Sequence, residues 1–140
     1  MDKKYKEWEI QIERAKKHNN ELLKEFEDTL IEKSLKPKTI KNHLENIDFF
    51  ANDYLLRYDI TLVEEGAQNI GMFLGDFFIR KASWASKYTI QENIASFKKF
   101  YTFLYESGRI PKKELLQMKE LIKDEKDEWI EEVENYWNKF

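Results

Sequence analysis

The sequence predicts an all-α protein, a single bundle of five or six helices spanning residues 1–140, and three observations support this fold. The 140 residues include 4 glycines, 2 prolines and no cysteine, whereas average usage would give roughly 10 glycines and 7 prolines, so turn-rich β-sandwiches and barrels are disfavoured. Apolar residues recur every three or four positions along most of the chain. With 36% charged and 15% aromatic residues, the composition indicates polar-coated helices around an aromatic core rather than disorder.

The first helical stretch is predicted to contain two helices. Its apolar positions are spaced by three or four residues and are Tyr5, Trp8, Ile12, Ala15, Leu22, Leu23, Phe26, Leu30 and Ile31. Asn19 and Asn20 interrupt this pattern, and asparagine is a good N-cap residue. This pair either caps a second helix or simply weakens one long helix, and we expect two helices.

The next helix begins at Pro37, because proline is favoured in the first helical turn. Its predicted inward face consists of Ile40, Leu44, Ile47, Ala51, Tyr54 and Tyr58. This stretch has the clearest helical pattern in the chain.

A further helix is expected after Thr61–Glu64, which has the form of a capping box. The inward positions predicted for it are Ala67, Ile70, Phe73, Leu74, Phe77 and Phe78. Gly71 and Gly75 lie one turn apart in this helix. Either they allow another helix to approach closely, or they merely soften the helix.

Two more helices complete the predicted bundle. Ser86 is the expected N-cap of the first, and Gly108 followed by Pro111 should end it. Its inward residues are Ile90, Ile94, Phe97, Phe100 and Leu104. The second, over residues 112–140, is an amphipathic C-terminal helix with apolar positions Leu115, Met118, Ile122, Trp129, Val133, Tyr136 and Phe140.

The net charge of -3 conceals a blocked distribution. Residues 33–43 carry four lysines and no acidic residue, and residues 80–109 carry six basic and two acidic residues. Between them, residues 44–79 carry one basic and seven acidic residues. Two basic islands therefore stand against an acidic background, as a nucleic-acid-binding chain could have.

The two basic islands lie on helices that resemble each other at an offset of fifty residues. Thr39-Ile40 corresponds to Thr89-Ile90, and the apolar positions that follow remain in register. Amphipathic helices of any bundle share such spacing, so the periodicity alone does not establish a repeat. It does not explain, however, why both helices begin with lysines.

Residues 34–50, SLKPKTIKNHLENIDFF, resemble the first conserved helix of the core-binding domain of tyrosine recombinases (phage integrases). Residues 86–110, SKYTIQENIASFKKFYTFLYESGRI, resemble a later helix of that domain and its closing Gly-x-Ile turn. The resemblance covers residues 20–111 and implies a SAM-like helical bundle that grips duplex DNA with these two helices. Residues 112–140 would then be an added C-terminal helix.

The DNA contacts that the resemblance implies are Lys36, Lys38, Thr39, Lys41, Asn42 and His43 in the first helix and Lys87, Tyr88, Thr89, Gln91, Lys98 and Lys99 in the second. Lysines and helix N-termini can neutralise phosphates, and Asn and Gln can reach base edges. Two positions depart from the family pattern. Lys36 stands where the family usually has a capping Ser or Asp, and His43 where Tyr is common.

No catalytic or cofactor site is expected. The chain has neither the recombinase His-x-x-Arg signature nor a glycine-rich phosphate loop. His18 and His43 lack a paired metal-ligand spacing, so no metal site is predicted. The acidic run at 124–128 lacks the glycine of a calcium loop and is interpreted as a solvated helix face whose charge should keep the C-terminal helix off DNA.

A protein partner, or self-association, is the other predicted interaction. The C-terminal helix carries a large apolar load that is typical of interfaces, comprising Trp129, Val133, Tyr136 and Trp137. Alternatively, this helix folds back onto the bundle together with Trp8. No apolar run of about 18 residues and no N-terminal signal region is present, so we expect a cytoplasmic protein without membrane contact.

The leading functional hypothesis is a stand-alone, non-catalytic relative of the recombinase core-binding domain that binds double-stranded DNA as a regulator or accessory factor of a mobile element. An alternative is a protein-interaction module of the same fold that does not bind DNA. A third is one domain of a larger recombinase.

Overall fold

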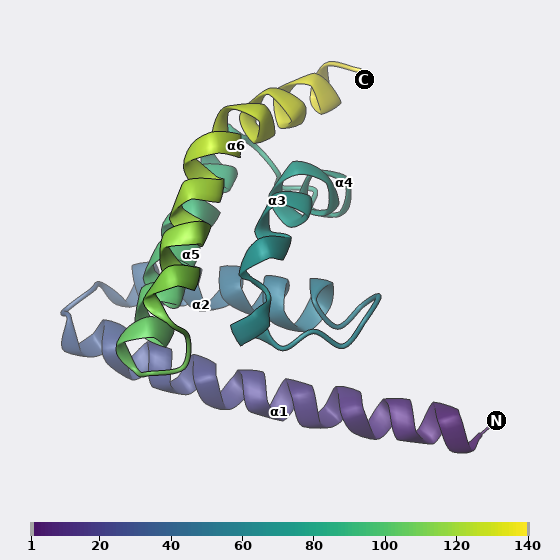
Figure 1. Ribbon diagram of the computed structural model, residues 1–140. Coiled ribbons are helices and arrows are strands. Elements are labelled where there is room, and N and C mark those ends of the chain that lie inside the picture. Colours follow the sequence, from purple (N-terminus) through teal and green to yellow (C-terminus); the bar gives the residue numbers. More distant parts are fainter. Residues whose placement is uncertain (1, 140) are drawn as a thin grey trace. The chain divides into compact units, whose positions relative to one another are not determined.

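The computed structural model describes residues 2–139 and confirms the all-α prediction, with no strand among these residues (Figure 1). The chain divides into two compact units, one ending at Gly66 and the other beginning at Ala67. Within the described part of the chain, none of the helices combines the length and the apolar character needed to cross a bilayer. Each unit has its own set of packed helices.

The first unit consists of a long helix and a shorter one packed on it. These are α1 (Lys3–Glu32) and α2 (Pro37–Asp48), which continues into the π-helical segment η1 (Phe49–Tyr54). Both α2 and η1 contact α1. The buried residues of α1 begin only in its middle, at Ala15, and continue as Asn19, Leu22, Phe26 and Leu30. Residues 3–14 of α1 therefore contribute no core.

The predicted break at Asn19–Asn20 is wrong, because α1 runs through both residues. Asn19 is 1% exposed. Its Nδ2 donates hydrogen bonds to Asn52 Oδ1 at 2.9 Å and, more weakly, to the Ala51 carbonyl at 3.4 Å. The Asn19 amide is thus bound to η1 instead of capping a new helix.

The inward face of the helix that begins at Pro37 also changes direction after three turns. Ile40 and Ile47 are buried as predicted, but the Leu55 N–H then donates to the Phe50 carbonyl at 2.9 Å, a five-residue spacing. This wider π-type turn inserts a residue and rotates the following positions. As a result Leu55 is buried, whereas Tyr58, predicted to point inward, is 67% exposed.

The predicted capping box at Thr61–Glu64 does not form. The 3₁₀ turn η2 (Val63–Glu65) has Leu62 at its N-cap and no side-chain cap. Glu64 is occupied elsewhere, because its Oε2 lies 2.6 Å from His18 Nε2 on α1. This contact attaches the segment after η1 to α1.

The second unit places one interrupted helix and two long helices around a shared core. The first segment runs without a gap through η3 (Ala67–Asn69), α3 (Ile70–Met72), the π-helical η4 (Phe73–Phe77) and α4 (Phe78–Lys81). The long helices are α5 (Lys87–Glu106) and α6 (Lys112–Asn138). Figure 1 shows α6 running alongside α5, and α6 also contacts η3, α3, η4 and α4.

The predicted limits of α5 are confirmed. Ser86 is its N-cap and forms a reciprocal capping box with Thr89. Gly108, two residues beyond the helix, has φ of 78°, a left-handed conformation that favours glycine. All five predicted inward residues are buried, namely Ile90, Ile94, Phe97, Phe100 and Leu104.

The glycines of the interrupted helix face α6, so the close-approach interpretation holds. A Cβ atom placed on Gly71 would lie 2.8 Å from Glu125 Oε1, and one on Gly75 would lie 2.9 Å from Trp129 Cδ1. Trp129 is 2% exposed, so its ring packs tightly there. Of the inward residues predicted for α6, Leu115, Met118, Ile122, Trp129 and Val133 are buried, and Phe140 lies outside the described residues.

We predict that Gly75→Ala lowers the free energy of unfolding by about 1–3 kcal/mol, because the new methyl group meets a buried indole that has no room to move. Gly71→Ala is the matched control. Its methyl group meets the end of the flexible Glu125 side chain, so it should be neutral or stabilise the helix by up to about 1 kcal/mol. Urea unfolding measures both, and equal effects would contradict the packing described.

Candidate nucleic-acid interface

The predicted contacts in the first unit cluster at the start of α2. Lys36 is the N-cap residue of the helix, without a side-chain capping bond. Five of the six predicted side chains are exposed, namely Lys36, Lys38, Thr39, Lys41 and Asn42. Lys41 Nζ lies 3.9 Å from Glu45 Oε1, an exposed pair one turn apart that stabilises little. This end of α2 presents cations beside a helix N-terminus, a combination that favours anions.

His43 is not available for DNA, and its prediction as a contact is wrong. Its side chain is 8% exposed. It lies three residues after Ile40 and four before Ile47, and therefore on the stripe that α2 buries. His43 belongs to the core of its unit.

The predicted contacts on α5 are exposed with one exception. Lys87, Tyr88, Gln91, Lys98 and Lys99 are exposed. Thr89 is half-buried, and its hydroxyl accepts the Ser86 N–H at 2.9 Å and lies 3.1 Å from the Trp84 carbonyl. Because the hydroxyl is used in the cap, we assign Thr89 a structural role in place of the predicted DNA contact.

The exposed contacts of α5 lie along the helix on a definable face. Lys87, Gln91 and Lys98 are separated by four and seven residues, which in an α-helix places them one above another. Lys99 is rotated away from this row by about 100°. The row leads from the N-terminus of α5 toward its middle, where α6 lies alongside.

Lys98 lies at the edge of a hollow that is lined mainly by lysines. The hollow has a volume of about 430 Å³, and its lining residues are Lys98 of α5 and Lys119, Ile122, Lys123 and Lys126 of α6. All of its lysines are exposed. Within the described part of the chain, none of them forms an ion pair. We call this set the lysine groove.

The α6 half of the lysine groove was missed at the level of sequence, where this helix was interpreted as an acidic face. Lys119, Lys123 and Lys126 have the spacing of four and three residues that marks one helix face. This spacing could have been found in the sequence. The summed charge of the segment obscured it.

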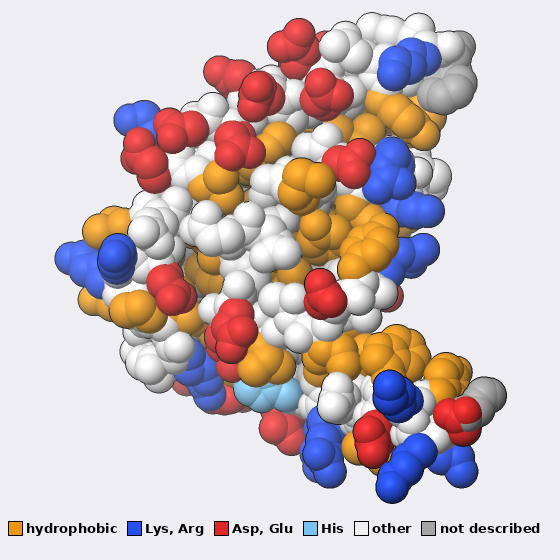
Figure 2. Space-filling model, turned by 45° about the vertical axis from the view of Figure 1, so that its right-hand side comes forward, with side chains coloured by type: hydrophobic (Ala, Val, Ile, Leu, Met, Phe, Trp, Pro, Cys, Tyr) orange, Lys and Arg blue, Asp and Glu red, His pale blue; other side chains and the backbone are white. Residues whose placement is uncertain are grey.

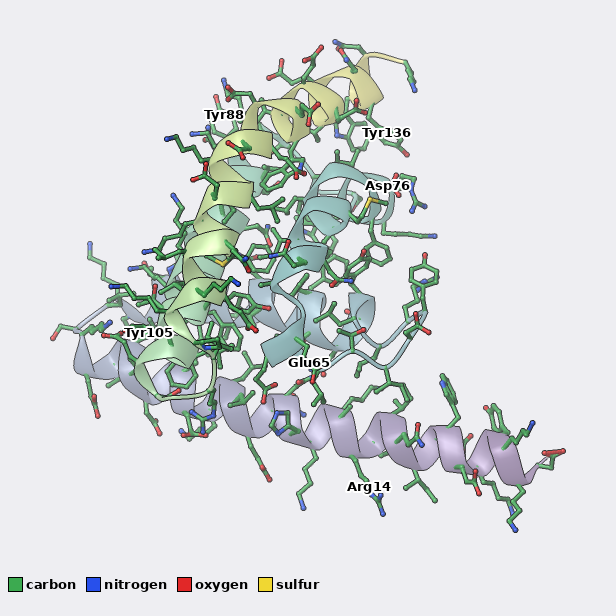
Figure 3. The ribbon with its side chains drawn as sticks, in the orientation of Figure 1. Arg14, Glu65, Asp76, Tyr88, Tyr105 and Tyr136 are labelled. Carbon is green, nitrogen blue, oxygen red and sulfur yellow. The ribbon has the colours of Figure 1, made fainter. Side chains whose placement is uncertain are left out.

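The acidic residues of α6 gather on another flank. A second hollow is lined by Glu125, Glu128, Glu131 and Glu132 together with Gly71, Met72, Gly75 and Asp76. Acidic side chains are prominent along α6 in Figure 2. In Figure 3, Asp76 and Tyr88 lie on opposite sides of α6. The lysines of the groove and these four carboxylates therefore line different hollows along α6.

The predicted partner interface on α6 is largely internal. Trp129 and Val133 are 2% and 0% exposed, so they pack within the chain, as the fold-back alternative predicts. Tyr136 is half-buried, and Trp137 is 44% exposed. Trp137 Nε1 donates to the Ala85 carbonyl at 2.8 Å and joins the end of α6 to the residue before the α5 cap. Trp8, in contrast, remains 46% exposed on α1 and stacks with Tyr5.

Comparison of the chain with protein-family models, with curated proteins and with solved structures found no match. The resemblance to recombinases therefore depends on the two sequence motifs. Among the residues described, no group of three or more His, Cys, Asp or Glu side chains is arranged to hold a metal ion.

We predict that Thr89→Val lowers the free energy of unfolding by about 1 kcal/mol, because valine keeps the shape of threonine but cannot complete the cap. Thr102→Val, on the same helix and half-buried, is the control and should change stability by less than half as much. Thermal and urea unfolding measure the difference. If Thr89→Val keeps its stability but binds DNA more weakly, the structural assignment is wrong and Thr89 is a DNA contact.

Proposed function

We propose that this protein is a non-catalytic module that binds the backbone of duplex DNA through the lysine groove of the second unit, and that the lysines at the start of α2 form a separate DNA-binding surface on the first unit. The observation that carries this proposal is the convergence of Lys98 with three lysines of α6, all exposed and without a carboxylate partner among the described residues. Unpaired cations held together on a rigid surface favour a polyanion, because the binding releases the counterions condensed on it.

The dimensions of the lysine groove suit a DNA backbone. From Lys119 to Lys126 the helix rises by about 10 Å, which equals about three steps of 3.4 Å along one strand. Lys87 and Gln91 extend the surface along α5. Lysines contact phosphates without reading sequence, and Gln91 is the side chain in this row that can bind adenine edges.

The resemblance of residues 34–50 and 86–110 to recombinase motifs agrees with this proposal, because it assigns DNA contacts to α2 and α5 independently of the groove. It also suggests the biological setting, an accessory or regulatory role in DNA recombination by a mobile element. The proposed module binds DNA and does not itself catalyse recombination.

The groove is tested by Lys119→Glu/Lys123→Glu. We expect the double variant to lose most of its duplex affinity, and the slope of log affinity against log salt to become shallower by about 1.8, because about 0.9 is lost for each phosphate contact. Fluorescence anisotropy with a labelled duplex between 20 and 200 mM salt measures both quantities.

The control is Lys6→Glu/Lys113→Glu, which makes the same change of net charge at exposed positions outside the groove. It should reduce affinity far less and leave the slope nearly unchanged. Equal losses in the two double variants would mean that only net charge matters and would contradict the groove. Circular dichroism confirms that all variants remain folded.

The α2 surface has its own test in Lys38→Glu/Lys41→Glu, two exposed positions in the first turns of the helix. We expect a marked loss of duplex affinity, because the substitution places carboxylates beside the phosphates that these lysines are proposed to hold. The same anisotropy titration measures it. Unchanged binding would remove α2 from the DNA-binding surface and leave the groove alone.

A second candidate function, protein interaction, is favoured by the N-terminal half of α1. Tyr5 and Trp8 are 58% and 46% exposed, and their rings stack 5.9 Å apart. They precede the buried stripe of α1 at helical spacing, so one apolar face of the helix lacks a cover. Failure to bind any duplex at low salt, together with a sedimentation coefficient that rises with concentration and returns to the monomer value in Trp8→Ala, would favour this function.

A further inference from the structure

Three large aromatic side chains are exposed together where α5 begins and α6 ends. Trp84, Tyr88 and Trp137 are 56%, 68% and 44% exposed. The hydrogen bond from Trp137 Nε1 to the Ala85 carbonyl places its indole next to Trp84 in the chain, and Tyr88 follows in the first turn of α5. We call these residues the aromatic cluster.

Charged side chains of both signs lie near the aromatic cluster in the chain, because Lys81 and Lys87 flank Trp84 and the exposed Glu92 lies one turn after Tyr88. Lys87 Nζ lies 5.5 Å from the centre of the Tyr88 ring, a cation–π distance. Lys81, at the end of α4, is also exposed.

The aromatic cluster and the lysine groove lie along the same side of the α5–α6 pair. On α6, Lys126 and Trp137 are eleven residues apart, which is three helical turns, so they share a face. On α5, Lys87 and Lys98 are also eleven residues apart, whereas Tyr88 is rotated from this row by about 100° and shares the face of Lys99. The helices therefore carry a path of about 16 Å from the lysines to the aromatic rings.

We propose that the aromatic cluster stacks unpaired bases, so that the preferred ligand is duplex DNA with a single-stranded extension. The duplex backbone lies along the lysine groove, and the extension continues past its end to Trp84, Tyr88 and Trp137. This arrangement combines a cationic track with aromatic stacking, the two components of single-strand binding, and stacking accepts any base. The inference rests on the proposed DNA-binding function and adds a preference within it.

The full chain is titrated with three labelled ligands that share one duplex of 16 base pairs. The first is blunt, the second has a six-nucleotide single-stranded extension, and the third has an extension of six abasic nucleotides that keeps the phosphates but lacks the bases. We expect the extension with bases to increase affinity about tenfold over the blunt duplex, as stacking of one base provides. The abasic extension should provide only a small part of this gain.

The variants separate stacking from fold and charge. Tyr88→Ala should lower the ratio of extended-duplex to blunt-duplex affinity, measured within the same variant, to near one, and Tyr88→Phe, which keeps the ring, should restore that ratio. Tyr105→Ala is the matched control, because Tyr105 is an exposed tyrosine at the opposite end of α5 (Figure 3). It should retain the full gain.

Three results overturn the inference while the proposed function survives. One is equal affinity for the three ligands, and the second is an equal gain from abasic and base-containing extensions. A sedimentation coefficient that falls in Tyr88→Ala without any change in the gain would assign the cluster to self-association and overturn it as well. Absence of binding to every DNA ligand at 20 mM salt overturns the proposed function and this inference together.

Discussion

The second unit depends on the close contact between α6 and the helix that carries Gly71 and Gly75. Because neither glycine has a Cβ, the carboxylate of Glu125 can approach Gly71 and the indole of Trp129 can approach Gly75 more closely than an alanine at either position would allow. This contact fixes the rotation of α6 about its axis. With Trp129 and Val133 buried, Lys119, Lys123 and Lys126 must face the α5 side. A packing constraint of the core thus creates the charge pattern of the surface, and the groove would be lost if α6 rotated by one residue, about 100°.

The first unit is organised by polar contacts as well as by apolar burial. Asn19 reaches Asn52, and His18 contacts Glu64, so residues close together near the middle of α1 hold both η1 and η2. Buried amides need partners, and the hydrogen bond donated by Asn19 Nδ2 favours one register of η1 on α1, while Asn19 Oδ1 is buried without a hydrogen-bond partner among the described residues. The N-terminal half of α1 has no such contacts and exposes Tyr5 and Trp8. The same helix therefore supplies a core at one end and an uncovered aromatic face at the other.

Local rules predicted the elements whose determinants are near in sequence. The Ser86 cap, the Gly108 stop and the inward stripe of α5 are all set within a few residues, and so was the start of α2 at Pro37. The rules failed where a distant partner changed the role of a side chain. Asn19 and Glu64 are residue types that often cap helices, yet Asn19 binds Asn52 and Glu64 contacts His18. The π-helical turn after Asp48 changes which residues face inward, and a constant helical period cannot predict this change. The same holds for the candidate site. The sequence predicted the exposed lysines of α2 and α5, but it did not predict that His43 is buried and that the Thr89 hydroxyl is used in the helix cap.

By itself, the sequence determined that this protein is helical and that its net positive charge is greatest in two segments, residues 33–43 and 80–109. Periodicity and composition carry this information, because helix formation and burial on one face are local properties of the chain. Only the tertiary structure decided which charges act together. Lys98 and Lys126 are far apart in sequence and belong to segments of opposite net charge, yet both line one groove because α5 and α6 pack side by side. Electrostatic surfaces depend on distances in space, and no sum along the chain contains these distances.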